Sequence, residues 1–221
     1  MPDRQHILRG VADAILRFPS MRVVRVAIDG VDGAGKSMFG DELTQLLTAA
    51  GRRIIRASVD AFHHPRAIRY RQGRESPEGY FYDSYDYAQL KTLLLDPLSP
   101  GGSGRYRTAA FDHRSDRPVD GPEEQAASGD MLIFDGIFLH RPELHAYWDY
   151  SVFLEVGVAV AMARCAERDG TSPDPRAPDN RRYMDGQQLY LRTCEPWRYA
   201  TVVIKNEPLE SPTIVARSIS T

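Results

Sequence analysis

The sequence is poor in cysteine and in excess charge of either sign. Its 221 residues include two cysteines, Cys165 and Cys194, and neither forms a CxxC pair or stands at a ligand spacing with histidine. This argues against a disulfide framework and favours a reducing compartment. The 28 basic and 30 acidic residues leave a formal net charge of −2, which argues against a general binder of nucleic acid or of membrane surfaces.

Long apolar runs are also missing. No run approaches the ~20 residues that a transmembrane helix requires. Residues 1–18 alternate charged and apolar positions and lack the continuous apolar stretch of a signal peptide. We therefore expect a cytoplasmic protein without a membrane or nucleic-acid partner. The sequence leaves open whether the chain forms a homo-oligomer.

Apolar residues as a class are plentiful, at 42% of the chain, which is enough for the core of one domain. Short β-branched runs alternate with segments of helical periodicity, and this order indicates an α/β fold with a mostly parallel sheet. The stretch 60–87 is polar and aromatic and predicts little regular core structure, whereas the proline-rich stretch 171–180 predicts a mobile loop. We expect strands over 22–29, 53–58, 131–136, 151–156 and 201–206, helices over 7–16, 39–50, 90–94, 158–168 and 183–194, and an optional strand over 105–112.

The segment GVDGAGKS, from Gly30 to Ser37, follows one expected strand and opens the next helix. It fits the P-loop pattern GxxxxGK[ST] at every fixed position. Glycines let the backbone curl so that successive N–H groups face one concavity, and the helix N-terminus adds its positive end. The Lys36 ammonium would reach the outer phosphates, and the Ser37 hydroxyl would ligate Mg²⁺. The residues expected to hold the nucleotide are Gly30, Asp32, Gly33, Ala34, Gly35, Lys36, Ser37 and Met38.

A nucleotide held in this way can be hydrolysed to drive a switch, or it can donate a phosphoryl group to an acceptor. Switches that use GTP usually carry a guanine-reading NKxD segment, and the nearest sequence here, IKNEP at 204–208, is only distantly similar. Both functions stay open at this point.

Four further segments accompany the P-loop: SVDAFHHPR at 58–66, YFYDSYDY at 80–87, FDGIF at 134–138 and FLEVGVAVAMARCAERD at 153–169. With them the chain resembles the uridine kinase and phosphoribulokinase group of P-loop kinases, from Val23 to about Asn206. The resemblance implies transfer of the γ-phosphoryl group of ATP or GTP, with Mg²⁺, to a hydroxyl group of a small acceptor. A nucleoside such as uridine or cytidine is the acceptor implied, with pantothenate, glycerate or a sugar phosphate as alternatives.

The same resemblance implies a three-layer P-loop NTPase fold. We expect one kinase domain over residues 1–221, with a mostly parallel five-stranded sheet flanked by helices. A short lid is expected at about 170–182.

Two aspartates follow expected strands, at the edge where open α/β sheets bind ligands. In the resembled kinases, the aspartate at the position of Asp60 contacts the acceptor hydroxyl and is the proposed general base. Asp135 ends the apolar strand MLIFD and has the Walker-B form, so it would hold Mg²⁺ together with Ser37. Either aspartate can also simply cap a strand or helix end.

Other acceptor-site residues are implied by position. Asp83 matches the residue that holds sugar hydroxyl groups, although Asp86 lies close enough to be confused with it. Phe111 and His113 occupy the place of a tyrosine and a histidine that read the pyrimidine in uridine kinases. Because Phe111 cannot donate a hydrogen bond, this departure puts uridine itself in question.

Arginines gather in two places. Arg164, Arg168, Arg181 and Arg182 flank the proline-rich stretch, and Arg164 and Arg168, four residues apart, share one helix face. The resemblance implies that lid arginines in this region stabilise charge on the transferred phosphoryl group. A second basic run near Asp60 would suit an acidic acceptor such as a sugar phosphate or a carboxylate, or it is an exposed loop. That run consists of Arg66, Arg69, Arg71 and Arg74.

Overall fold

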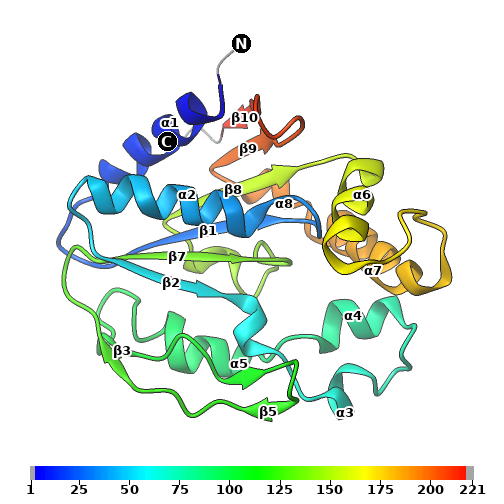
Figure 1. The fold of residues 1–221 in the computed structure, drawn as a ribbon. Coiled ribbons are helices and arrows are strands. Elements are labelled where there is room, and N and C mark those ends of the chain that lie inside the picture. Colours follow the sequence, from blue (N-terminus) through cyan, green and yellow to red (C-terminus); the bar gives the residue numbers. More distant parts are fainter. Residues whose placement is uncertain (1–2, 218–221) are drawn as a thin grey trace.

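The computed structural model describes residues 3–217, shown in Figure 1. The helices are α1 (Arg4–Leu16), α2 (Lys36–Ala49), α3 (Arg66–Arg69), α4 (Pro77–Asp83), α5 (Tyr87–Leu90), α6 (Val158–Asp169), α7 (Pro178–Cys194) and α8 (Pro196–Tyr199), with the short turns η1 (Val59–Phe62), η2 (Lys91–Leu95) and η3 (His145–Tyr147). The strands are β1 (Val24–Gly30), β2 (Ile54–Ser58), β3 (Arg105–Tyr106), β4 (Phe111–Asp112), β5 (Arg117–Pro118), β6 (Glu124–Gln125), β7 (Met131–Gly136), β8 (Tyr150–Glu155), β9 (Val202–Lys205) and β10 (Thr213–Arg217).

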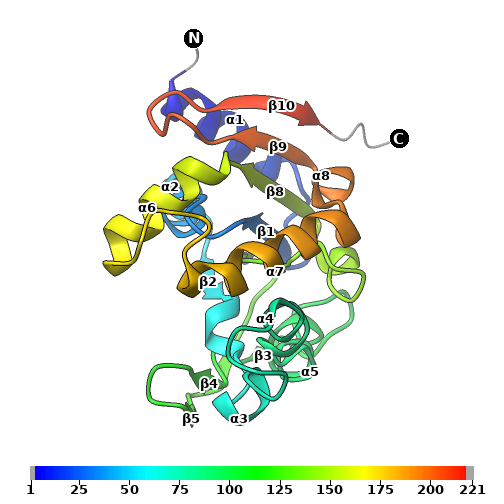
Figure 2. The same ribbon diagram turned by 90° about the vertical axis from the view of Figure 1, so that its right-hand side faces the viewer.

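The central sheet has six strands in the order β10-β9-β8-β1-β7-β2, which Figure 2 shows from β10 at the top downward. The five strands from β9 to β2 are parallel, as expected. The sixth, β10, is antiparallel to β9 and was not expected. It lies at the edge of the sheet and Val215 is exposed, so the strand lacks the buried apolar run that marks the central strands.

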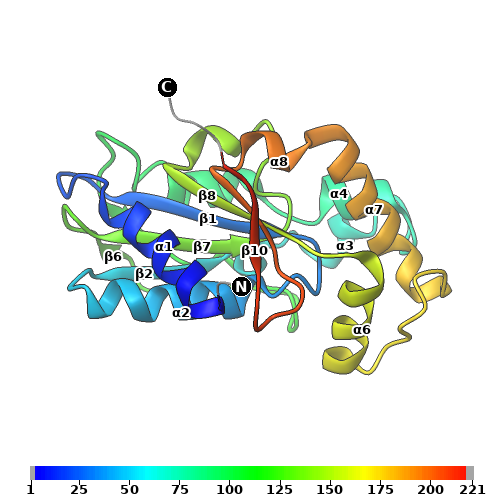
Figure 3. The ribbon, with the colours of Figure 1, turned by 90° about the horizontal axis from the view of Figure 1, so that it is seen from above.

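Two hydrophobic clusters cover the two faces of the sheet. Helices α1 and α2 pack on one face, against side chains such as Ile28 and Ile133. In Figure 1 α2 lies in front of the sheet, and in Figure 3 it lies along the lower side of the strands, opposite α8. The other face carries α4, α5, η2 and α7, which pack on Phe134 and Phe153. These three layers confirm the expected α/β architecture.

The stretch 60–87 has more structure than its composition predicted. It forms η1, α3 and α4, and it buries Tyr80, Phe81 and Tyr85 against Phe138. Aromatic side chains carry this packing, and they do not follow the aliphatic periodicity by which a core helix is recognised.

Two other boundaries differ from expectation. Helix α7 begins at Pro178, five residues before the expected start, because proline is well suited to the first helical position. Part of the expected loop 171–180 is therefore helical. The optional strand over 105–112 divides into β3 and β4. Within residues 3–217, no helix has the length and apolar character needed to cross a membrane.

Candidate functional site

The P-loop connects β1 to α2 at the carboxyl edge of the sheet. Gly33 and Gly35 have φ angles of +74° and +85°, a backbone conformation that side-chain-bearing residues rarely adopt. Gly33 also lies against α6, because a Cβ atom added to it would come within 2.3 Å of the carbonyl oxygen of Ala161. Glycine is therefore required at residue 33 both by the loop conformation and by the packing of α6.

The curled loop leaves backbone donors free. No side chain caps α2, and within residues 3–217 the N–H groups of Gly33, Gly35, Lys36 and Ser37 have no acceptor in the chain. Unpaired N–H groups at a helix N-terminus form a site for phosphate. The ammonium group of Lys36 lies within the same loop, where it donates to the carbonyl oxygen of Val31 at 2.8 Å. These residues fit a bound polyphosphate.

Hard oxygen donors stand next to this cradle. The Ser37 hydroxyl donates to one carboxylate oxygen of Asp135 at 2.7 Å, and Nη1 of Arg56 contacts the other at 2.6 Å. Asp135 is buried at the end of β7. A hydroxyl and one carboxylate suit Mg²⁺, which takes its other ligands from phosphates and water. Among the described residues, no group of three or more His, Cys, Asp and Glu side chains is arranged to hold a metal ion by itself.

Helix α7 is joined to the P-loop by side-chain contacts. The backbone N–H of Asp32 donates to Oε1 of Gln187 at 2.6 Å, and the Asp32 carboxylate accepts a hydrogen bond from the Tyr80 hydroxyl at 2.8 Å. Burial and the charge of Asp32 raise the pKa of Tyr80 well above its usual value, so Tyr80 stays a donor at neutral pH.

A buried polar network lies beneath the start of the loop. Asp29 is 0% exposed, and its carboxylate accepts from the backbone N–H of Gly30 at 2.7 Å, from Nδ1 of His140 at 2.7 Å and from the hydroxyl of Tyr190 on α7. The other ring nitrogen of His140 contacts Ser151 Oγ at 2.9 Å. Buried polar groups that are all paired in this way fix a unique arrangement.

A cavity of about 220 Å³ opens beside Asp60, which follows β2 in η1. Asp60 is exposed, and its carboxylate accepts from the Tyr85 hydroxyl at 3.2 Å. Burial, followed by the charges of Asp60 and Asp32, raises the pKa of Tyr85 well above its usual value. Burial also lowers the pKa of His63 to about 4, so its ring is neutral at pH 7. The cavity thus offers the exposed Asp60 carboxylate beside the hydroxyl group of Tyr85 and the neutral ring of His63.

The structure brings some of the expected acceptor residues to this cavity and leaves others outside it. His113 lines the cavity together with Asp60. Phe111 is 5% exposed in the core and is not part of the lining. Asp83 is 2% exposed and is also outside the lining, with its carboxylate bound by Arg71 at 2.5 and 3.0 Å and by the amide of Gln72 at 2.6 Å. Burial alone would raise the pKa of Asp83, but these hydrogen bonds lower it.

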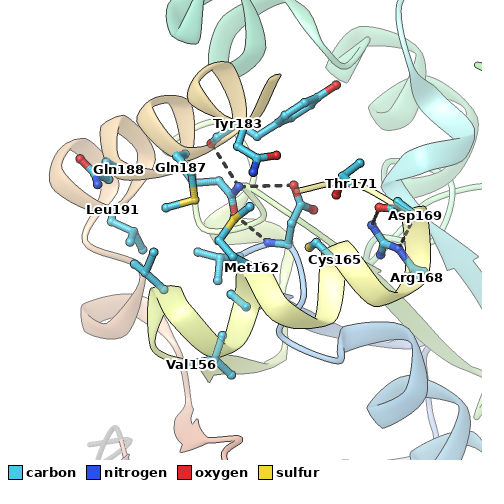
Figure 4. Close-up of a pocket in the computed structure, with 16 residues that line it drawn as sticks. Val156, Met162, Cys165, Arg168, Asp169, Thr171, Tyr183, Gln187, Gln188 and Leu191 are labelled. Carbon is cyan, nitrogen blue, oxygen red and sulfur yellow. Dashed lines mark hydrogen bonds and ion pairs between the residues drawn. The ribbon is translucent and has the colours of Figure 1, made fainter. Parts of the chain in front are cut away.

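The two arginines of α6 have different contacts. Arg164 donates to the carbonyl oxygens of Gly33, at 3.2 Å, and Asn206, at 3.0 Å, and so joins the P-loop to the loop after β9. Arg168 pairs with its neighbour Asp169 at 2.7 Å. Arg168 faces a second cavity of about 440 Å³ between α6 and α7, which Figure 4 shows with Met162, Cys165 and Leu191 on its mainly apolar walls.

The two cavities adjoin, because Asp32 and Tyr183 line both. The structure therefore places the P-loop, Asp60, Asp135 and the α6 arginines at one end of the sheet.

Sequence reasoning missed several residues of this region. Arg56 and Gln187 contact Asp135 and Asp32, and Asp29, His140 and Tyr190 form the buried network. No local motif marks them, because each contact joins residues distant in the chain. The aspartate before Gly30 was a visible signal, since an acidic residue in a buried strand needs a partner.

Comparisons with known proteins agree with this geometry. The model of the phosphoribulokinase/uridine kinase family matches residues 25–173, and no curated protein matches the chain. Among solved structures, a possible uridine kinase from Bacillus stearothermophilus is similar with a TM-score of 0.70 and 23% identity, covering 90% of this chain and 97% of that one. A candidate fructose transport system kinase from Silicibacter sp. TM1040 has a TM-score of 0.61 and 23% identity, with 82% and 94% covered.

D-glycerate 3-kinase from Cryptococcus neoformans has a TM-score of 0.55 and 14% identity, with 97% and 99% of the two chains covered. At these identities, the similar structures show the P-loop kinase fold.

Proposed function

Because the chain belongs to the phosphoribulokinase/uridine kinase family, we propose that it transfers the γ-phosphoryl group of ATP or GTP to a hydroxyl group of a small acceptor. The observation that carries this proposal is the position of the Asp60 carboxylate. It lines a cavity that also reaches Asp32 of the P-loop, so an acceptor in that cavity lies beside the phosphate cradle. A nucleotide hydrolase without an acceptor would have no use for this arrangement.

Each residue of the cradle has a role in the proposed reaction. The N–H groups of Gly33, Gly35 and Lys36 bind phosphate oxygens, and the Lys36 ammonium stabilises negative charge on the phosphoryl group. Ser37 and Asp135 would hold Mg²⁺, which neutralises charge between the β- and γ-phosphates when it is bound.

Asp60 orients the acceptor hydroxyl and takes its proton. The acceptor oxygen then forms a bond to the γ-phosphorus while the bond from that phosphorus to the β–γ bridging oxygen breaks, so the nucleoside diphosphate leaves. In this proposal Arg168 on α6 and the lid at about 170–182 exclude water that would otherwise hydrolyse the nucleotide.

The identity of the acceptor is a separate part of the proposal. The family resemblance favours a nucleoside such as uridine or cytidine, and the aromatic side chains of Tyr70, Tyr85 and His113 around the cavity would suit stacking on a base. A second class, hydroxy acids and sugar phosphates, is favoured by two arginines, Arg69 and Arg182, which line the same cavity.

The test is acceptor-dependent release of ADP. Purified protein with ATP and Mg²⁺ is incubated with uridine, cytidine, pantothenate, glycerate and several sugar phosphates in turn, and the initial rate of ADP formation is recorded. We expect a rate near zero without an acceptor and a steep rise with one of them. A constant rate of hydrolysis that no acceptor changes would instead support a nucleotide switch.

A further inference from the structure

Two of the arginines that line the acceptor cavity are buried. Arg69, at the end of α3, is 8% exposed, and Arg182, on α7, is 5% exposed. Removing a guanidinium ion from water is unfavourable unless an opposite charge or a full set of hydrogen bonds compensates it. The partners of these two groups therefore indicate what the cavity is built to receive.

Within residues 3–217, Arg182 has no carboxylate partner. Its Nη1 donates to the carbonyl oxygens of Gly73, at 3.2 Å, and Arg74, at 3.0 Å, and its Nη2 donates to that of Arg69 at 3.1 Å. These contacts hold the side chain in place but do not neutralise it. Burial lowers the pKa of Arg182, which is the response of a cation whose charge is poorly compensated.

The guanidinium group of Arg69 has fewer and longer hydrogen bonds than that of Arg182. Its Nη2 lies 3.4 Å from both the carbonyl oxygen of His113 and a carboxylate oxygen of Asp116, which is long for a charged hydrogen bond. Its Nε is buried and has no partner. A buried donor without an acceptor is rare in native proteins, so the Arg69 guanidinium is incompletely compensated by the chain.

The ring of Tyr70 gathers the positive charge at this end of the cavity. The guanidinium carbons of Arg69, Arg74 and Arg182 lie 5.5, 5.1 and 4.9 Å from its centroid. Among the described residues, neither Arg74 nor Arg182 forms an ion pair with a carboxylate. Three cations on one aromatic ring repel one another, and an anion bound between them would relieve that repulsion.

The acidic groups of the cavity are engaged elsewhere. Asp32 accepts from the Tyr80 hydroxyl, Asp60 accepts from the Tyr85 hydroxyl, and neither forms an ion pair with Arg69 or Arg182. The cavity thus has carboxylates toward the P-loop and guanidinium groups toward Tyr70.

On the basis of the kinase function proposed above, we propose that the acceptor is an anion. Its hydroxyl group lies at Asp60, and its carboxylate or phosphate group is bound by Arg69 and Arg182. An oxyanion would match the fork of donors that a guanidinium presents. A neutral nucleoside would leave Arg182 without an opposite charge and Arg69 with only its long contact to Asp116.

The inference is tested with pairs of acceptors that differ in one charge. Initial rates of ADP formation are compared for glycerate against glycerol, pantothenate against its neutral alcohol, and a pentose 5-phosphate against the free pentose. We expect kcat/KM for at least one anion to exceed that of its neutral counterpart by about tenfold or more, because a charged hydrogen bond contributes ~1.5–3 kcal/mol. The carboxylate and phosphate pairs then distinguish the two kinds of oxyanion.

Variants connect the effect to the two arginines. Arg69→Gln and Arg182→Gln are each expected to raise KM for the anionic acceptor about 10- to 100-fold and to leave KM for ATP within about twofold. Arg182→Lys should recover part of the loss, because it keeps the charge without the fork. Arg66→Gln is the matched control, since Arg66 belongs to the same basic run but is exposed and lies outside the cavity lining. Thermal unfolding checks that each variant is folded. If Arg182→Gln does not fold, Arg69→Gln alone tests the inference.

A binding measurement separates this inference from the proposed kinase function. Glycerate and a pentose 5-phosphate are titrated by calorimetry into protein saturated with Mg²⁺ and a non-hydrolysable ATP analogue, so that the P-loop is filled. Anion binding that Arg69→Gln abolishes, without turnover of any acceptor, supports the anion site and contradicts the kinase proposal. Turnover of uridine at a rate unaffected by Arg69→Gln overturns the anion site but supports the proposed kinase function. Anion binding that is absent, or unchanged in both variants, also overturns it.

Discussion

The hydroxyl group of Tyr190, in the middle of α7, donates a hydrogen bond to the carboxylate of Asp29, the residue that immediately precedes the P-loop glycine Gly30. The two residues are 161 positions apart in the chain. Helix α7 therefore contacts the phosphate-binding loop at two points, here and through Gln187 at Asp32. Helix α7 is thus part of the support of the P-loop.

Removal of the Tyr190 hydroxyl should destabilise the protein. Tyr190→Phe leaves the buried Asp29 carboxylate without one of its donors, and such a loss costs about 1–3 kcal/mol. The free energy of unfolding is measured by urea denaturation. Tyr183→Phe on the same helix is the control, because within residues 3–217 the Tyr183 hydroxyl has no hydrogen-bond partner, and it should change stability by less than about 0.5 kcal/mol. Equal stability of Tyr190→Phe and wild type would contradict the role of the network.

Asp60→Asn should abolish most of the turnover without weakening the binding of ATP. The amide keeps the shape of the side chain and a hydrogen bond from Tyr85, but it cannot take the acceptor proton. We expect kcat to fall about 10²- to 10⁴-fold, with the Kd for ATP in the presence of Mg²⁺ within about threefold. Asp13→Asn, on the exposed face of α1, is the matched control. Full activity of Asp60→Asn would remove Asp60 from the mechanism.

Asp135→Asn should weaken the binding of Mg²⁺ and lower the rate of the Mg²⁺-dependent reaction. The substitution removes the negative charge beside Ser37, so we expect kcat to fall about 10²-fold or more and the Mg²⁺ concentration for half-maximal rate to rise. Asp135 also pairs with Arg56, and that second role needs a control. Asp41→Asn removes the other carboxylate partner of Arg56, at 3.0 Å, without touching Ser37. If the two variants show the same Mg²⁺ dependence, the carboxylate of Asp135 acts only through Arg56.

His63 should make stability depend on pH in mildly acidic solution. Burial lowers its pKa from 6.5 to about 4 in the folded protein. Between these values the unfolded chain binds a proton that the folded chain does not, so stability falls as the pH drops from about 6.5 toward 4. His63→Gln should flatten this part of the curve, measured as urea midpoints at pH 7, 5.5 and 4.5. A wild-type midpoint that stays constant across this interval, or a His63→Gln curve as steep as that of wild type, would count against the buried neutral imidazole.

The sequence predicts the architecture well because the necessary signals are local. The glycines, lysine and serine of the P-loop stand within eight residues, and the parallel strands are short runs rich in apolar residues. Asp135 was identifiable for the same reason, since a carboxylate at the end of a buried strand is a local pattern, and the structure places it next to Ser37 at 2.7 Å.

The acceptor side could not be predicted to the same depth. Its walls come from α3, α4 and α7, and the contacts that define it join residues such as Arg69 and Arg182, 113 positions apart. Asp83 was expected to hold the acceptor, but no spacing rule predicts that Arg71 and Gln72 occupy its carboxylate. Aromatic residues of the 60–87 stretch form the wall, and their packing follows shape more than periodicity. The roles assigned to individual residues stay predictions until the variants are measured.

The close fit of Gly33 to α6 has a mechanical consequence. With no room for even one methyl group between this loop and the carbonyl of Ala161, the loop cannot shift toward α6 unless the helix moves with it. Arg164, on the same helix, donates to the carbonyl oxygens of both Gly33 and Asn206, so a displacement of the P-loop would also be transmitted to the turn that follows β9. A shift of the P-loop and a shift of α6 are therefore coupled, and a substitution that alters the position of one is expected to alter that of the other.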